Sequence, residues 1–369
     1  MKIDIDTNRI FGLDILRALA VMFVVIAHGS YLLPVKFKEI IHFFLFDGVT
    51  IFFVLSGFLI GGILIKLIDK NGFSLQTLKG FWIRRWFRTL PNYFLILLIL
   101  CIIHVIFDPG FSIRNITRYF IFSQNLYKPH PPFFPEAWSL AVEEWFYLIF
   151  PSLLFVVMYL KISFKNGLLN IAIITILLIT AFRIYRFSNV EINNINDLDL
   201  LFRKQVITRL DSLMFGVVGA YLRYFHLSLW LRYKKQFLII GILVFIVTKI
   251  SFPLVPIGSF YLSVLSFTFV SIGTLMLLPY LSELKSGKGI LYKPITYISL
   301  ISYSMYLINL SLIQTWIINP IPWTDITENA WIRIIANYSI YWILVIVLSI
   351  IIYKYVERPT TSLRERFSK

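Results

Sequence analysis

The sequence predicts an all-α, polytopic integral membrane protein, and two observations carry that prediction. Hydrophobic residues make up 58% of the chain and charged residues 15%, whereas a soluble domain is about half apolar and about a quarter charged. The apolar residues also come in long blocks, without the amphipathic period of soluble helices or strands. Because backbone groups in lipid must hydrogen-bond within their own segment, blocks of this length are expected to be helices.

About ten blocks have the roughly 17–25 residues that a helix needs to cross a bilayer. In chain order they cover residues 11–33, 43–66, 90–107, 138–160, 168–187, 207–225, 236–254, 260–281, 296–318 and 331–355. The polar stretches between them are too short for a separate soluble domain, and the longest are 66–89, 108–137 and 186–206. We therefore expect a single transmembrane domain over 1–369.

The chain is strongly basic, with 35 lysines and arginines against 19 acidic residues. Most of the basic residues fall in segments that face the cytoplasm if the N-terminus is inside, as the positive-inside rule requires. This distribution predicts an N-in, C-in orientation and explains the charge without a nucleic-acid partner. The histidines and the single cysteine form no cluster with metal-ligand spacing, so we expect no metal.

The first block carries three ionisable residues, Asp14, Arg17 and His28, on one face of the expected helix. At about 100° per residue, Arg17 and His28 differ by roughly 20° in azimuth, and Asp14 lies about 60° from Arg17. The axial distance from Arg17 to His28 is about 16 Å, roughly half of a bilayer core. Ionisable groups inside hydrocarbon are costly and usually serve a function. The stripe predicts a polar track with a fixed cation at one end and a proton acceptor deeper in the membrane.

Arg85 and Arg88 precede the third block, at the expected cytoplasmic face. Because they are three residues apart, they project from the same side of a helix. Two guanidiniums in this arrangement can hold phosphate groups through paired hydrogen bonds. The alternative is a topology anchor, in which the arginines and the neighbouring Trp82 and Trp86 only fix the helix end at the membrane interface.

The fourth block begins, at the expected outer face, with Ser139, Glu143, Glu144 and Tyr147. Glu143 is four residues from both Ser139 and Tyr147, so these three share a helix face. Ser139 could instead be an ordinary N-cap, with Glu143 favoured by the helix dipole. Two adjacent glutamates exceed what capping needs, so at least one of them is expected to face a polar cavity.

Two further features are less specific. The small residues Ser56, Gly57, Gly61 and Gly62 in the second block favour close helix packing over a chemical role. The sequence also places Arg209 and Asp211 near the start of the sixth block, where they could form an interfacial ion pair. For that pair a structural role and a functional role are equally open.

Four of these motifs together resemble the membrane acyltransferase-3 family, which includes O-acetyltransferases that act on O-antigen, peptidoglycan and Nod factors. The motifs are Arg17-x10-His28, Phe52–Ile60, Arg85-x-x-Arg88 before a proline, and Ser139-Leu-x-Val-Glu143-Glu144-x-Phe146-Tyr147. The sequence departs from the family pattern at two places. Asp47 precedes Gly-Val where the family often has an aspartate after it, and Asn309 stands where the family often has a histidine.

The resemblance implies an O-acyltransferase in the bacterial cytoplasmic membrane. Its donor would be an acyl-CoA, in the first place acetyl-CoA, and its acceptor a hydroxyl of a carbohydrate such as a cell-surface polysaccharide or an exported glycoside. The runner-up hypothesis is a permease or flippase for a glycoside or lipid-linked sugar, since buried charges in about ten spans also suit transport. A degenerate relative that serves as a sensor is disfavoured, because the motif residues are intact.

The candidate residues then have three expected roles. His28, whose ordinary pKa near 6.5 suits a general base, would remove the proton from the acceptor hydroxyl or, if the acyl group passes through a covalent intermediate, from a relay nucleophile. Glu143 on the outer side would bind sugar hydroxyls or orient His28. The CoA phosphates would lie against Arg17, Arg85 and Arg88. Supporting roles fall to Asp14, Ser139, Glu144 and Tyr147, with Asp14 holding Arg17 through an i,i+3 pair.

Overall fold

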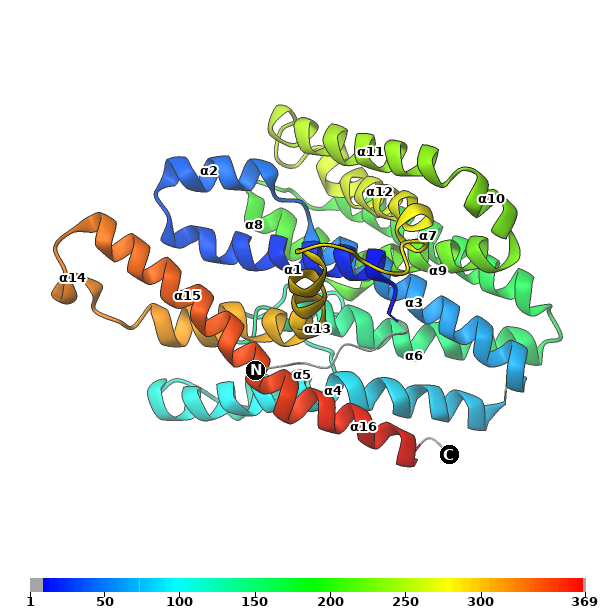
Figure 1. The fold of residues 1–369 in the computed structure, drawn as a ribbon, viewed down its shortest axis with the longest axis horizontal. Coiled ribbons are helices and arrows are strands. Elements are labelled where there is room, and N and C mark those ends of the chain that lie inside the picture. Colours follow the sequence, from blue (N-terminus) through cyan, green and yellow to red (C-terminus); the bar gives the residue numbers. More distant parts are fainter. Residues whose placement is uncertain (1–8, 73, 368–369) are drawn as a thin grey trace.

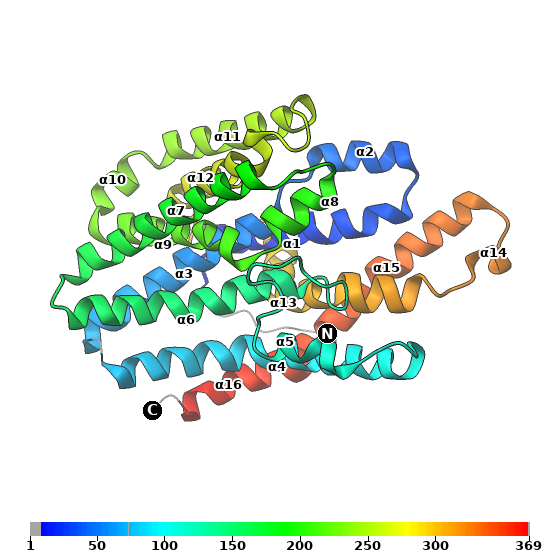
Figure 2. The same ribbon diagram turned by 180° about the vertical axis from the view of Figure 1, so that it is seen from behind.

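The computed structural model describes residues 9–72 and 74–367, and over these ranges the chain forms helices joined by turns, without a strand. Most long helices run roughly along the long axis of the molecule (Figures 1 and 2). Within the described ranges, nine helical segments are long and apolar enough to cross a membrane. The prediction of an all-α, polytopic membrane protein is therefore confirmed.

The longer helices are α1 (Phe11–Gly29), α3 (Gly48–Asn71), α4 (Leu75–Phe107), α6 (Ala137–Tyr159), α7 (Phe164–Asn189), α9 (Leu210–Phe225), α11 (Lys234–Leu254), α12 (Ser266–Leu281), α13 (Tyr292–Ile308) and α15 (Ala330–Ile352). The shorter ones are α2 (Val35–Phe44), α5 (Thr117–Phe120), α8 (Ile195–Leu198), α10 (Leu227–Arg232), α14 (Trp323–Ile326) and α16 (Arg358–Phe367). Segments of π-helix include η3 (Asp199–Arg203), η5 (Tyr261–Leu265), η6 (Asn309–Ile318) and η7 (Tyr353–Glu357). Helix α1 lies centrally and packs on α3, α12 and α13, whereas α16 lies along α4 (Figure 1).

The sixth predicted span, 207–225, differs from the others. Its helix α9 has 16 residues, which at 1.5 Å each is about 24 Å, less than the roughly 30 Å of a bilayer core. It packs closely on α3, where a Cβ on Gly57 would lie 1.8 Å from the Leu213 carbonyl oxygen and one on Gly216 would lie 2.0 Å from that of Val54. The packing role expected for the small residues of the second block is confirmed for Gly57 and Gly61. A Cβ on Gly62 would have no neighbour within 4 Å, and the Ser56 hydroxyl contacts a residue of α6 instead.

Helix α4 begins much earlier than the third predicted span. Ser74 caps its first turn, its Oγ accepting from the Thr77 N–H at 3.1 Å, and the helix then runs for 33 residues. Most of the expected polar stretch 66–89 is therefore helical. In consequence Arg85 and Arg88 lie about a third of the way along a helix of roughly 50 Å instead of at its end.

Candidate active site

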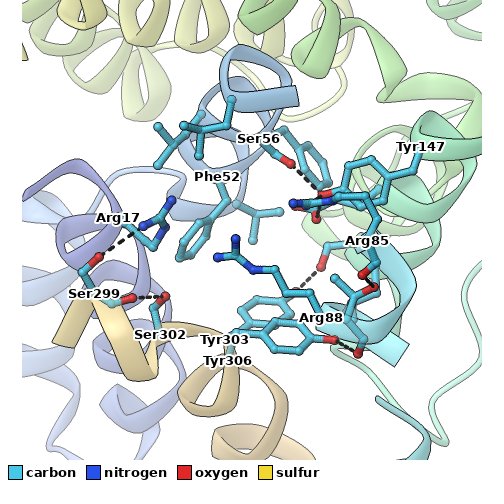
Figure 3. Close-up of a pocket in the computed structure, with 18 of the residues that line it drawn as sticks. Arg17, Phe52, Ser56, Arg85, Arg88, Tyr147, Ser299, Ser302, Tyr303 and Tyr306 are labelled. Atoms are coloured by element: carbon cyan, nitrogen blue, oxygen red, sulfur yellow. Dashed lines mark hydrogen bonds between the residues drawn. The ribbon is translucent and has the colours of Figure 1, made fainter. Parts of the chain in front are cut away.

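A single cavity gathers most of the polar side chains singled out above, and we call it the central cavity (Figure 3). Helices α1, α3, α4, α6 and α13 and the π-helix η7 all contribute to its wall. The charged and hydroxyl-bearing lining residues are Arg17, Ser56, Arg85, Arg88, Thr89, Ser139, Glu143, Tyr147, Ser299, Ser302, Tyr303, Tyr306 and Glu357. The sequence therefore identified three arginines and Glu143 that the fold brings to one place.

The Tyr147 hydroxyl is the hub of one wall of the central cavity. It donates to Glu143 Oε2 at 2.6 Å and accepts from Arg85 Nη2 at 2.8 Å. The Ser56 Oγ lies 2.7 Å from the same oxygen. The Arg85 guanidinium also stacks over the Tyr147 ring, 4.5 Å from its centroid. The predicted shared face of Glu143 and Tyr147 is confirmed, and through Tyr147 it is joined to α4.

The sequence predicts Glu143 at the outer face, apart from the arginines, and the structure contradicts this separation. Glu143 lines the same cavity as Arg85 and Arg88. Helix α4 begins before these arginines and packs on α6, so both arginines lie beside the helix that carries Glu143. Glu144 points instead toward α4, where the Thr89 Oγ1 donates to its Oε1 at 2.7 Å. Ser139 donates to the Tyr306 hydroxyl at 2.6 Å and is not the N-cap of α6, which is Glu136.

Arg17 is held on the opposite wall by α1 and α13. Its Nη1 lies 3.5 Å from Asp14 Oδ1 and 3.4 Å from the Ser299 Oγ. The predicted i,i+3 pair is therefore present, but Asp14 has nearer partners: Ser299 donates to it at 2.7 Å and Arg9 Nε at 3.0 Å. Asp14 is shared, so the charge of Arg17 is only partly compensated.

Arg88 points into the middle of the central cavity (Figure 3). Its side chain is exposed there, and among the described residues none makes a hydrogen bond or an ion pair with its guanidinium. The Glu357 carboxylate, which also lines the cavity, accepts hydrogen bonds from Asn92 Nδ2 at 3.1 Å and Ser304 Oγ at 3.0 Å. The cavity thus contains a cation that the described part of the chain leaves without a direct partner.

His28 lies farther along α1, outside the lining of the central cavity. Its Nδ1 is 2.6 Å from Asn309 Oδ1, at the point where α13 passes into η6. Tyr306, which lines the cavity, is about one helical turn before Asn309. No hydrogen bond joins His28 to Glu143 within the described ranges. The expectation that Glu143 orients His28 is therefore not supported by a direct contact.

Several lining residues had no role among the sequence-based expectations. Tyr303, Tyr306 and Glu357 belong to short motifs, Ser302-Tyr-Ser-Met-Tyr306 and Glu357-Arg-Pro359, that carry little signal alone. Both motifs resemble the acyltransferase-3 pattern only weakly, and that resemblance was the sequence cue for them. Within the part of the chain that the structure describes, no three histidine, cysteine or acidic side chains gather as metal ligands.

The suggested pair of Arg209 and Asp211 is wrong. Residues two apart on a helix point to nearly opposite sides, and these two have different partners. Arg209 donates to the Thr50 Oγ1 and lies 4.0 Å from Asp47. Asp211 pairs with Arg183 at 2.6 Å, with both side chains fully buried.

Comparison with known proteins places the chain in a family. A family model described as an acyltransferase domain matches residues 10–354. The peptidoglycan O-acetyltransferase OatA of Listeria monocytogenes is 37% identical over 190 residues, which is 45% of this chain and 29% of that protein. A putative peptidoglycan O-acetyltransferase of Bacillus subtilis, YrhL, is 36% identical over 168 residues, or 41% of this chain and 25% of that protein.

A putative O-acetyltransferase of Staphylococcus aureus strain COL is 31% identical over 232 residues, or 57% of this chain and 34% of that protein. The matched regions thus cover only 25% to 34% of each of these relatives. No solved structure is similar. Because the family model covers nearly the whole chain, this protein belongs to the membrane acyltransferase-3 family.

Proposed function

We propose that this protein is a membrane O-acyltransferase that moves an acyl group, in the first place acetyl, from acyl-CoA to a hydroxyl of a carbohydrate. The observation that carries the proposal is the convergence of Arg17, Arg85 and Arg88 on one cavity. Family membership and the names of the relatives support the reaction class. Those names also favour a peptidoglycan glycan as the acceptor, in a bacterial cytoplasmic membrane.

The donor would lie with its phosphates toward the arginines. Guanidiniums bind phosphate oxygens through paired, charge-assisted hydrogen bonds, and Arg88 has none of its donors committed to a described residue. The thioester arm would then extend past Tyr303 toward Ser139 and Tyr306, which line the same cavity. With the N-terminus inside, the phosphate end would open to the cytoplasm, where acyl-CoA is made.

His28 would act as the general base at the far end of this track. The acceptor oxygen attacks the thioester carbonyl carbon while its proton passes to His28 Nε2. The tetrahedral intermediate collapses, the carbon–sulfur bond breaks, and the thiolate takes up the proton to leave as CoA thiol. The products are the carbohydrate ester and free CoA, and His28 returns to its neutral form. Proton transfer by a positioned side chain contributes about 10²- to 10⁴-fold in rate.

The test uses the purified full chain in lipid vesicles with acetyl-CoA and a soluble peptidoglycan fragment. We expect free CoA thiol to appear in step with an acetyl ester on the fragment, detected by mass spectrometry. His28→Ala is expected to abolish both signals while the protein stays folded by size-exclusion chromatography. Near-normal transfer in that variant would refute the base role. Passage of the glycan across the vesicle wall without acetyl-CoA, and without ester formation, would favour a permease.

A further inference from the structure

We propose that Asn309 is the positioning residue for His28: it fixes the imidazole as the tautomer protonated at Nδ1 and leaves Nε2 free to accept a proton. The inference rests on the proposed function, because it concerns the base of that reaction. It is carried by the hydrogen bonds at the junction between α13 and η6, where three side chains from three parts of the chain meet.

The orientation of the Asn309 amide is determined by what surrounds it. Its Nδ2 donates to the Met305 carbonyl oxygen at 2.9 Å and to the Tyr306 carbonyl oxygen at 2.8 Å. Both carbonyls can only accept, so the NH2 group must point toward them and not the amide oxygen. The amide oxygen Oδ1 is thereby turned toward His28, 2.6 Å from its Nδ1.

This geometry decides where the imidazole proton lies. Asn309 Oδ1 cannot donate, so His28 Nδ1 must be the donor in this bond. A neutral imidazole has only one N–H, which leaves a lone pair on Nε2. Among the described residues none hydrogen-bonds to Nε2, and the His28 side chain is only partly buried. The ring is therefore held by one nitrogen and open at the other.

The Glu136 carboxylate stabilises the helix junction that holds Asn309 in this orientation. Its Oε1 accepts from the backbone N–H groups of Leu310 at 3.0 Å and Ser311 at 2.7 Å. In a continuous α-helix those donors would bond to the carbonyls of Tyr306 and Leu307. Glu136 takes them instead, and the chain continues as the π-helix η6.

Asn309 completes the same junction from inside the helix. The Tyr306 carbonyl, which Leu310 would have used, accepts from Asn309 Nδ2. The Tyr306 hydroxyl in turn donates to the Glu136 backbone carbonyl at 3.2 Å. Asn309 is itself fully buried, so its amide has little freedom to turn. The junction thus fixes Asn309, and Asn309 fixes His28.

Two substitutions of Asn309 separate positioning from simple capping. Asn309→Asp keeps an oxygen that accepts from His28 Nδ1 but loses the Nδ2 donor to Met305 and Tyr306. Asn309→Leu loses both. If Asn309 serves only to cap the junction, the two variants should be equally impaired. If it positions His28, the aspartate should retain activity and the leucine should not.

The experiment measures kcat and the KM for acetyl-CoA, with the peptidoglycan fragment saturating, for the full chain in lipid vesicles. We expect Asn309→Leu to lower kcat about 10- to 100-fold, part of the general-base contribution, with the donor KM unchanged. Asn309→Asp is expected to stay within about threefold of the wild-type kcat. Thr315→Val is the matched control: it removes a side-chain hydrogen bond to the Leu310 carbonyl elsewhere in η6 and should leave kcat unchanged.

Equal losses in the two Asn309 variants, or an unaltered kcat in Asn309→Leu, would overturn the inference. Should Asn309→Leu fail to insert, Asn309→Asp decides alone: a kcat near wild type supports positioning, and a loss as large as that of His28→Gln overturns it. His28→Gln also tests the proposed function separately. If it retained wild-type kcat, the base assignment itself would fail, and this inference would fall with it.

Discussion

Two sets of three arginines lie within the membrane domain, and their surroundings differ in one respect. The cavity cluster consists of Arg17, Arg85 and Arg88, and the paired cluster consists of Arg183, Arg203 and Arg209. In the paired cluster every guanidinium has a carboxylate within ion-pair distance. In the cavity cluster, among the described residues, only Arg17 does, at 3.5 Å from Asp14.

The charges of the paired cluster are compensated by carboxylates of the protein. Arg183 meets Asp211 at 2.6 Å, and Arg203 meets Asp47 at 3.1 Å. Arg183 and Arg209 also face the same ring, with guanidinium carbons 5.8 Å and 4.4 Å from the Phe267 centroid. A buried charge is tolerated only when it is compensated. Here the protein supplies the compensation, so the cluster serves the fold.

The cavity cluster leaves its compensation incomplete. Arg85 is bonded to a phenol, and Arg88 points into the cavity without a described partner (Figure 3). Cations gathered in a membrane domain repel one another unless an anion joins them. We infer that the missing anion is the ligand. An arginine with a protein carboxylate beside it would then stabilise the fold, and an arginine without one would bind the ligand.

The largest expected effect is on the paired cluster. Arg183→Leu leaves Asp211 buried and unpaired, and breaking such a pair costs about 3–5 kcal/mol. We expect a strong loss of folded protein, measured by thermal unfolding in detergent, with transfer per folded molecule unchanged. The double variant Arg183→Leu with Asp211→Leu should recover part of the stability. If the single variant unfolded like wild type, the distinction between the clusters would be lost.

The second effect is on donor binding. Replacing both Arg85 and Arg88 by glutamine removes two charge-assisted bonds worth about 1.5–3 kcal/mol each at most. We expect the KM for acetyl-CoA to rise about 100-fold or more, without the stability loss expected for Arg183→Leu. An unchanged KM would make the two arginines topology anchors. Arg232→Gln, a basic residue elsewhere on a short helix, provides the control for loss of positive charge alone.

These outcomes would also show how far a single sequence can reach. Features that depend on spacing within one helix were predictable, because the helical period alone fixes them. Asp14 and Arg17 pair across one turn, and Glu143 and Tyr147 bond across another. The number of long helices was nearly right for the same reason, since block length and apolarity decide it.

Features that depend on where a helix begins or on distant partners were not predictable. Arg85 meets Tyr147 because α4 starts at Leu75, whereas the apolar block that predicted this span began only at residue 90. The Asn309 partner of His28 lies 281 residues away in sequence. Such contacts follow from the packing of several helices, which no local pattern in one chain specifies.

The third effect concerns the hub of the cavity wall. Tyr147→Phe removes the hydroxyl that Arg85, Glu143 and Ser56 share, so Glu143 loses a donor and Arg85 loses an acceptor. We expect the donor KM to rise several-fold, because Arg85 is less well held, together with a stability loss of about 1–2 kcal/mol. Steady-state transfer rates at varied acetyl-CoA concentration measure the first effect. A KM equal to wild type would show that Arg85 is positioned by stacking alone.

The smallest effect should come from Arg203, although it belongs to the paired cluster. Its side chain is 33% exposed. Its removal leaves neither carboxylate unpaired, because Asp199 still pairs with Lys204 at 2.5 Å and Asp47 still pairs with Arg209 at 4.0 Å. Partly exposed pairs contribute about 0–1 kcal/mol, so Arg203→Gln should lower the unfolding temperature by only a few degrees. Transfer should be unaffected, because Arg203 does not line the central cavity. A loss as large as that of Arg183→Leu would mean that the number of ion pairs, and not the burial of the partner left behind, sets the cost.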